Sequence, residues 1–350
     1  QRNAGEISPA RGSIHKHQPD TNIPAYPRSS ASDNSTSAYP CYSKTTTPYQ
    51  SFIIKMTNLL WKKFNALGTE IVLTAFLKDN QKDILEKAKN VVFDFEKRFS
   101  RFLQGNELYR FNNFDGDYFE ASDMMIDLLK EAKKMNIETK GVFDPTVIGS
   151  LEALGYDKSF AEIAAAQNGE PRQGREKYED KTDKNIDPEK IGKNFLDRPK
   201  ISGLEFSGNK VSKPYGLRID FGGIGKGYIA DFLAKNVLSE IENFWISAGG
   251  DLFLKGPGED GKGWKVAVQN PNEPEKQTFS IQTRGKTLGV ATSAVFKRKC
   301  TAGGFKWHHL IDPKTGLSVK NDIIAVTAMA PTAEQADIYA KVVLILGKKQ

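Results

Sequence analysis

The sequence predicts an α+β fold, in which mixed or antiparallel sheets carry helices packed against them. Segments with the 3.6-residue period of a helix alternate irregularly with short strand-like runs, and no internal repeat is evident. The 350 residues are 39% hydrophobic and 27% charged, which is typical of a globular protein with a core of its own. Together these observations indicate layers of helices and strands around a core.

The beginning of the chain has a different composition. Residues 1–50 are rich in Ser, Thr, Pro, Asn and Tyr and show no hydrophobic period. Such a segment cannot bury enough apolar surface to offset the entropy lost on ordering. We predict a disordered tail or non-native extension over 1–55, with Met56 as a candidate start, and a folded domain over 60–350 whose C-terminus is a candidate truncation.

The first half of that domain shows one strand and two helices. A strand is expected at Ile71–Leu73, after a turn at Leu67–Thr69. Apolar residues recur at helical spacing over Asp79–Phe99 and over Ala121–Asn136. Residues 157–200 are polar and weakly patterned, so we expect a long insertion or lid that is partly helical near 160–166.

The second half begins with a strand, a loop and a helix. We predict them at Leu217–Phe221, Gly222–Gly227 and Tyr228–Ile241. A final helix is expected from Thr332 through Leu346. Further strands are predicted at Phe244–Ser247, Trp264–Gln269, Phe279–Thr283, Thr287–Ala291 and Ile323–Ala328.

Charge and cysteine content limit the function classes. The net charge is +7, but the excess lysines are scattered along predicted helices, so no nucleic-acid binding is expected. Two cysteines, Cys41 and Cys300, form neither a zinc site by themselves nor a disulfide framework. The chain shows no signal-peptide pattern and no run of about 18 apolar residues.

A glycine-rich loop at Asp220–Gly227 is a candidate anion site. Glycines let the backbone aim its N–H groups outward, the following helix adds partial positive charge, and Lys226 adds a full charge. The spacing matches neither the Walker A motif nor the dinucleotide fingerprint. An ordinary glycine-rich turn is the alternative interpretation.

Three further motifs carry acid–base or ligand chemistry. Asp144 precedes a proline, so it either points into a cleft or accepts local backbone N–H bonds in a turn. His308 and His309 point to opposite sides of an extended chain, so at most one is expected to face a cleft as general base. Asp337 near the start of the last helix is either solvated or an oxygen ligand for Mg²⁺.

The order of these motifs resembles the ApbE family, the FAD:protein FMN transferases, from about residue 64 to the C-terminus. The matching blocks are Phe99–Phe102, Asn106–Asn112, Phe143–Val147, Asp220–Gly227, Gly249–Asp251, Thr292–Ser293, His309–Gly316 and Ala336–Asp337. The resemblance implies an α+β domain with an FAD cleft between two subdomains. It also implies cleavage of FAD with release of AMP, and a phosphodiester link between FMN and a Ser or Thr of an acceptor protein such as a membrane redox subunit.

The resemblance also implies roles for individual residues. His309 would activate the acceptor hydroxyl, and Asp337 together with the backbone of Gly223 would bind the required Mg²⁺. The residues expected at FAD are Phe102, Val142, Phe143, Asp144, Asp220, Lys226 and Ile311. Family members often work outside the cytoplasmic membrane, so one expectation is a periplasmic protein or one anchored to the membrane through a missing N-terminus. The other expectation is a cytoplasmic protein that starts at Met56.

One position departs from the family pattern. Lys341 stands four residues after Asp337, where the family usually has a Thr or Ser as a further metal ligand. Positions 337 and 341 share a helix face, so the ammonium group either weakens Mg²⁺ binding or pairs with Asp337 and replaces the ion. An FAD pyrophosphatase that uses water as nucleophile, and a flavin-binding protein without turnover, are the alternative functions.

Overall fold

The computed structural model describes residues 58–348, except 160–185, 274, 296–298 and 303–304. The predicted tail over 1–55 and the predicted helical part near 160–166 lie outside the described residues. The largest sheet has the strand order β1-β2-β6-β7-β10-β13, and every neighbouring pair is antiparallel. Its strands are β1 (Asn58–Ala66), β2 (Thr69–Leu77), β6 (Phe244–Ala248), β7 (Asp251–Lys255), β10 (Leu288–Ala294) and β13 (Ala325–Ala330).

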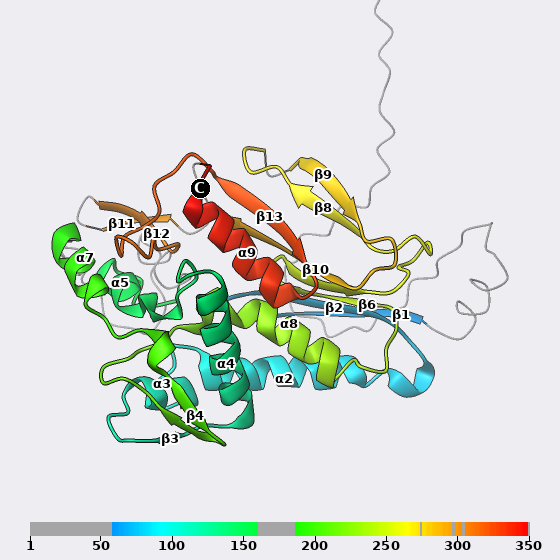
Figure 1. Ribbon diagram of the computed structural model, residues 1–350. Helices are drawn as coiled ribbons and strands as arrows, with labels where there is room; N and C mark the ends of the chain where they lie inside the picture. Colours follow the sequence, from blue (N-terminus) through cyan, green and yellow to red (C-terminus); the bar gives the residue numbers. More distant parts are fainter. Residues whose placement is uncertain (1–57, 160–185, 274, 296–298, 303–304, 349–350) are drawn as a thin grey trace, which may run out of the picture. The chain divides into compact units, whose positions relative to one another are not determined.

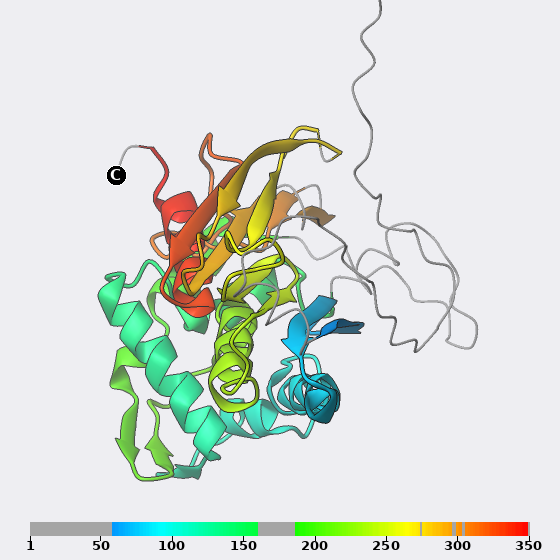
Figure 2. The ribbon, with the colours of Figure 1, turned by 90° about the vertical axis from the view of Figure 1, so that its right-hand side faces the viewer.

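Helices cover one face of this sheet. Both ribbon views show α2, α8 and α9 along that face, while the hairpin of β8 and β9 lies over the opposite one (Figures 1 and 2). The elements are α2 (Ile84–Phe99), α4 (Asp123–Glu138), α8 (Gly225–Asn236), α9 (Ala333–Leu346), β8 (Lys265–Gln269) and β9 (Gln277–Gln282). The prediction of an α+β fold with antiparallel strands and packed helices is confirmed.

Period-two alternation along the strands divides the core between the two faces. In β6, Phe244 and Ile246 belong to the main core with the helices, whereas Trp245 packs with the cluster under the hairpin. Successive side chains of a strand point to opposite faces, so a strand buried on both faces carries apolar residues at consecutive positions. The main core also takes the apolar stripes of α2 and α4, including Phe95 and Leu128.

Several short elements surround this framework and were not predicted. A three-stranded sheet has the order β3-β5-β4, and β11 pairs with β12. The helix α7 falls within the stretch predicted as an insertion or lid. These elements are α3 (Glu107–Asn112), β3 (Phe119–Glu120), α5 (Ile148–Ala153), α7 (Pro188–Leu196), β4 (Glu205–Ser207), β5 (Lys210–Ser212), β11 (Lys299–Ala302) and β12 (Phe305–His308), with single 3-10 turns at η1 (Asp79–Gln81), η2 (Pro145–Val147), η4 (Ile201–Gly203) and η5 (Phe221–Gly223).

The predicted strand at Leu217–Phe221 is wrong, and the predicted loop is shorter than expected. The backbone of Ile219 is bonded at both its N–H and its C=O to the side chain of Asn112, and the Asp220 N–H donates to the Pro145 carbonyl. Because these groups are satisfied outside any sheet, the segment joins no ladder. The helix α8 begins at Gly225 rather than Tyr228, so the last three loop residues form its first turn.

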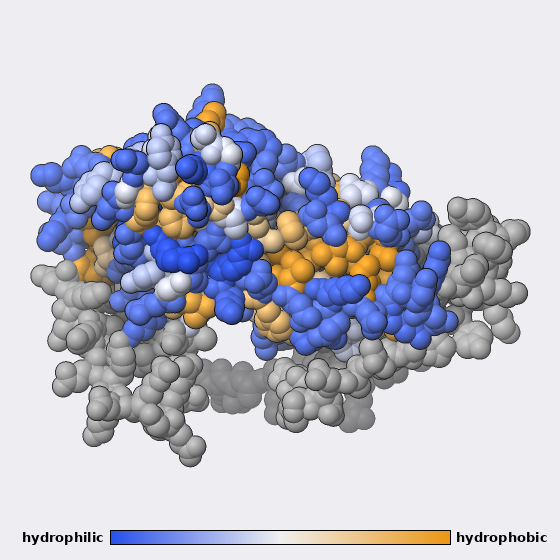
Figure 3. Space-filling model, turned by 90° about the horizontal axis from the view of Figure 1, so that it is seen from below, coloured by the Kyte–Doolittle hydropathy of each residue, from blue (hydrophilic) through white to orange (hydrophobic). Residues whose placement is uncertain are grey.

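The face of the molecule seen from below is mostly hydrophilic (Figure 3). Seen from below, charged and polar residues cover most of this face, and hydrophobic residues gather in one area of its right half (Figure 3). Within the part of the chain that the structure describes, no helix is long and apolar enough to cross a membrane.

Candidate active site

The first turn of α8 packs against the first turn of α9 at the candidate site. A Cβ at Gly227 would lie 2.5 Å from the Cα of Glu334, so only glycine lets α8 and α9 approach this closely. Asp231 of α8 accepts from the N–H groups of Ala333 (2.8 Å) and Glu334 (2.9 Å), and thereby caps α9. This packing brings Asp337 on the next turn of α9 close to the lysine of the glycine-rich loop.

Four charged side chains then form what we call the lysine–aspartate cluster: Lys226, Asp251, Asp337 and Lys341. The Lys226 ammonium pairs with Asp251 and lies 3.7 Å from Oδ2 of Asp337. The Lys341 ammonium pairs with Oδ1 of Asp337, whose side chain is only 2% exposed. Asp251 was not predicted as a site residue, although the Gly249–Asp251 motif was a signal for it.

An aromatic row lies beside the glycine-rich loop and consists of Phe102, Tyr156 and Trp307. Ring centroids are 5.9 Å apart both between Phe102 and Tyr156 and between Tyr156 and Trp307. The Arg101 guanidinium lies 4.3 Å from the Phe102 centroid and 4.5 Å from that of Tyr156. Phe102 remains 37% exposed, so a planar ligand can stack on it. Arg101, Tyr156 and Trp307 were missed, because nothing local in the sequence marks them as neighbours.

Asp220 and Asp144 each bond the backbone of their own loop and pair with an arginine side chain. Asp220 accepts from the Gly222 N–H (2.9 Å) and lies 3.6 Å from Nε of Arg101. Asp144 accepts from the N–H (2.9 Å) and hydroxyl (2.6 Å) of Thr146 and pairs with Arg198. The local contacts of Asp144 are thus those of the turn interpretation. Burial lowers the pKa of the Arg198 guanidinium, although the negative charge of Asp144 acts to raise it.

Of the other residues predicted at FAD, Phe143 and Ile311 are buried. Phe143 belongs to the main core, and its ring lies 3.4 Å from the place of a Cβ on Gly223. Ile311 is buried in the cluster that includes Tyr156 and Trp307. Val142 is partly exposed. Phe143 therefore packs against the glycine-rich loop, and Ile311 packs with the buried rings of the aromatic row.

The ring of His308 is engaged on both sides: Nε2 lies 2.9 Å from the Val319 carbonyl, and Nδ1 accepts from the Leu310 N–H (3.3 Å). This arrangement puts the proton on Nε2 and leaves His308 no nitrogen for a substrate. His309 is therefore the candidate general base of the pair.

The residues around Asp337 do not fit a divalent cation. Its Oδ2 atom is buried without a hydrogen-bond partner, as a metal ligand would be, but two ammonium groups face the same carboxylate. Repulsion at about 4 Å costs on the order of 4 kcal/mol per pair of unit charges in a partly buried site. Among the described residues no group of three His, Cys, Asp or Glu side chains could hold a metal ion.

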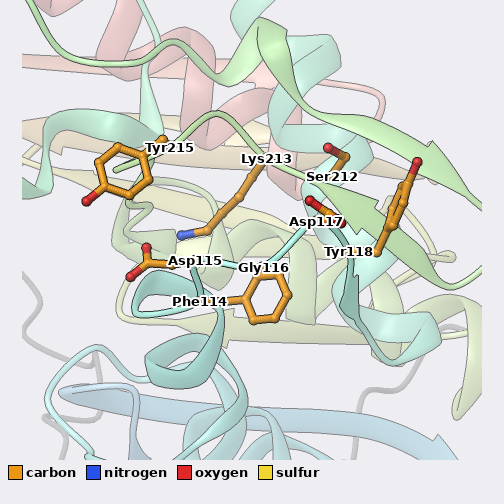
Figure 4. A pocket seen from close by; sticks show the side chains of 8 residues that line it. All are labelled: Phe114, Asp115, Gly116, Asp117, Tyr118, Ser212, Lys213 and Tyr215. Carbon is orange, nitrogen blue, oxygen red and sulfur yellow. The ribbon is translucent and has the colours of Figure 1, made fainter.

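A surface pocket of 410 Å³ lies elsewhere (Figure 4). Lys213 points into it, and its ammonium donates to the Leu217 carbonyl (3.0 Å). The pocket is lined by Phe114, Asp115, Gly116, Asp117, Tyr118, Ser212, Lys213 and Tyr215. None of the predicted site residues is among them, so this pocket is not the candidate active site.

Comparison with known proteins shows the family of the chain. The model of the ApbE family matches residues 67–350. The chain belongs to the ApbE family. ApbE relatives named FAD:protein FMN transferase include those of Vibrio cholerae, 26% identical over 277 residues (77% of this chain, 75% of the relative), and Klebsiella pneumoniae, 28% identical over 260 residues (73% and 69%).

Solved structures show the same ApbE fold. The ApbE protein of Thermotoga maritima matches with a TM-score of 0.68 at 24% identity, over 82% of this chain and 87% of that one. The flavin transferase ApbE of Vibrio cholerae matches with a TM-score of 0.63 at 23% identity, over 84% and 88%. The predicted ApbE-like fold is confirmed.

The start of α9 also makes stability depend on pH. Burial, together with the charges of Glu131 and Asp231, raises the pKa of the Glu334 carboxyl to about 8. The folded state keeps this proton to higher pH than the unfolded chain, so the stability it contributes is complete below about pH 4.5 and is lost as pH rises through 8. We expect Glu334→Gln to reduce the loss of unfolding free energy between pH 5 and pH 9 by roughly 2–4 kcal/mol.

Urea unfolding of both proteins at the two pH values measures this effect. Glu240→Gln, at an exposed position, serves as control and should leave the pH dependence unchanged. An equally steep loss of stability in Glu334→Gln and in the unaltered chain would show that Glu334 is ionised in the folded state.

Proposed function

We propose that the chain transfers the FMN moiety of FAD to the hydroxyl of a Ser or Thr in an acceptor protein and releases AMP. The observation that carries this proposal is the placement of Lys226 at the start of α8, beside the buried carboxylate of Asp337, in a member of the ApbE family. The names of its relatives supply the substrate and the type of reaction.

The site has two parts that suit the two ends of FMN. The aromatic row offers the exposed ring of Phe102 for stacking of the isoalloxazine. The first turn of α8 offers backbone N–H groups and the ammonium of Lys226 for the pyrophosphate. Asp144 and Asp220, which the family resemblance implies at FAD, each hold their own loop through a hydrogen bond to its backbone.

The transfer exchanges one phosphorus–oxygen bond for another. The acceptor oxygen attacks the phosphorus attached to riboflavin, and its proton passes to His309. The bond from that phosphorus to the bridging oxygen breaks, and the oxygen leaves with AMP. The protein contributes orientation and positive charge around the phosphates, which supply most of the rate enhancement in phosphoryl transfer.

The family resemblance further implies Mg²⁺ bound by Asp337 and the backbone of Gly223, with position 341 as a third ligand. The described residues at that place do not fit a divalent cation, and no step above is assigned to one. The acceptor as a membrane redox subunit, and membrane association through the N-terminal residues, remain predictions.

The proposal is tested by incubating the chain with FAD and Mg²⁺, with and without a peptide that carries a Ser or Thr flavinylation site. A peptide mass gain equal to an FMN phosphodiester, matched by AMP release and absent when the hydroxyl residue is replaced by Ala, would support the transferase. AMP without a modified peptide would favour the FAD pyrophosphatase. Neither product, with FAD still bound, would favour a flavin-binding protein.

His309→Ala is expected to slow peptide modification about 10²–10⁴-fold, because the acceptor hydroxyl loses its general base. FAD affinity, measured by quenching of flavin fluorescence, should change less than about twofold. His308→Gln is the matched control, since His308 is bonded to the backbone of Val319. A similar loss in both variants would assign the effect to local packing instead.

A further inference from the structure

We propose that the ammonium group of Lys341 takes the place of a divalent cation in this chain, so that Lys226 and Lys341 together bind the FAD pyrophosphate. This inference rests on the proposed function. It concerns a position where the chain departs from the ApbE pattern, and it follows from the contacts of the lysine–aspartate cluster.

Lys341 is directed at the carboxylate that would otherwise be a metal ligand. It stands one helical turn after Asp337 on α9, and its ammonium pairs with Oδ1 and lies 3.4 Å from the Asp337 carbonyl oxygen. Its side chain is 12% exposed, so most of it is enclosed by the protein. A solvated surface lysine would not be held in this way.

The cluster already balances its charges. Two carboxylates alternate with two ammonium groups in the order Asp251, Lys226, Asp337, Lys341. A divalent cation at Asp337 would add two positive charges to this neutral group, and it would first have to displace Lys341 from Oδ1. Asp337 is therefore suited to anchor two ammonium groups rather than to coordinate an ion.

The FAD pyrophosphate is negatively charged, so both lysine ammonium groups can bind it. It carries two formal charges, and each ammonium group has three N–H donors, so it can donate to a phosphate oxygen and still keep its carboxylate partner. When the bond to the bridging oxygen breaks, negative charge grows on the departing AMP phosphate. The two ammonium groups are fixed beside this charge and can stabilise it without any proton transfer.

The first measurement is metal binding by the unaltered chain, with and without FAD. Mn²⁺ is titrated and its free fraction is followed by electron paramagnetic resonance, and Mg²⁺ is titrated by calorimetry. We expect no site tighter than about 1 mM, and AMP release in EDTA within about twofold of that in Mg²⁺. A stoichiometric site in the micromolar range, or loss of AMP release in EDTA, would overturn the proposal.

Three variants test Lys341 itself, with FAD affinity in EDTA as the readout. Lys341→Met should weaken FAD binding at least about tenfold, and Lys341→Arg should stay within about threefold of the unaltered chain. Lys341→Thr should acquire Mn²⁺ binding that the unaltered chain lacks. Lys348→Met, at an exposed position near the end of α9, is the matched control and should change nothing. FAD affinity equal in Lys341→Met and the control would contradict the proposal.

These readouts separate the two proposals. If FAD binds but no form of the chain releases AMP, the proposed transferase activity is wrong. Mn²⁺ binding and FAD affinity still test the proposed role of Lys341 in that case. Circular dichroism of each variant identifies any that does not fold. The metal titration of the unaltered chain depends on no variant and decides the question by itself.

Discussion

Replacing Lys226 with Met is expected to slow release of AMP from FAD by about 10²–10³-fold, the usual cost of removing a preorganised charge from developing phosphate charge. The Lys226 ammonium is held by Asp251 and lies 3.7 Å from Asp337, at the first turn of α8. Met keeps the length of the side chain but removes the charge, so both the anion site and the pairing of two buried carboxylates are lost.

Lys235→Met is the matched control for this variant. Lys235 lies in the last turn of the same helix and is exposed, so its replacement should leave AMP release within about twofold. Initial rates at saturating and limiting FAD separate turnover from binding. Equal rates for Lys226→Met and the control would show that the pyrophosphate does not lie at the start of α8.

Replacing Gly227 with Ala is expected to destabilise the protein by about 1–3 kcal/mol and to reduce transfer activity as well. The added Cβ would meet backbone atoms of α9, with the Glu334 nitrogen at 2.7 Å and the Ala333 carbonyl oxygen at 2.8 Å. Backbone atoms cannot rotate aside, so α9 has to shift, and Asp337 moves away from Lys226.

Urea unfolding and AMP release together test this packing. The control is Gly149→Ala in α5, where nothing lies within 4 Å of an added Cβ. That change should stabilise the protein by up to about 1 kcal/mol, because Ala favours a helix over Gly. Stabilisation of a similar size in Gly227→Ala would mean that α8 and α9 are not in close contact at this position.

The elements with strong periodicity were predictable from the sequence. The stripe of Ile84, Ala88, Val92 and Phe95 predicted α2, and the last helix and the strands β2, β6, β8, β9, β10 and β13 were placed within a few residues. The strands β1 and β7 were not predicted. Their signals are local, because each depends on which residues recur at helical or strand spacing. The short elements α3, α5 and α7 escaped prediction because six to nine residues hold too little periodicity.

Of the candidate site, the sequence by itself determined the motifs: the lysine in a glycine-rich loop, the histidine pair and the acidic residue on the last helix. It also showed Lys341 one turn from Asp337. Only the tertiary structure decided which residues meet, because Arg101, Tyr156 and Trp307 come from distant segments and Asp251 reaches Lys226 from a neighbouring strand. The physical reason is that burial and charge pairing depend on which residues the fold brings together. These residues are far apart along the chain, where no helical or strand period relates them.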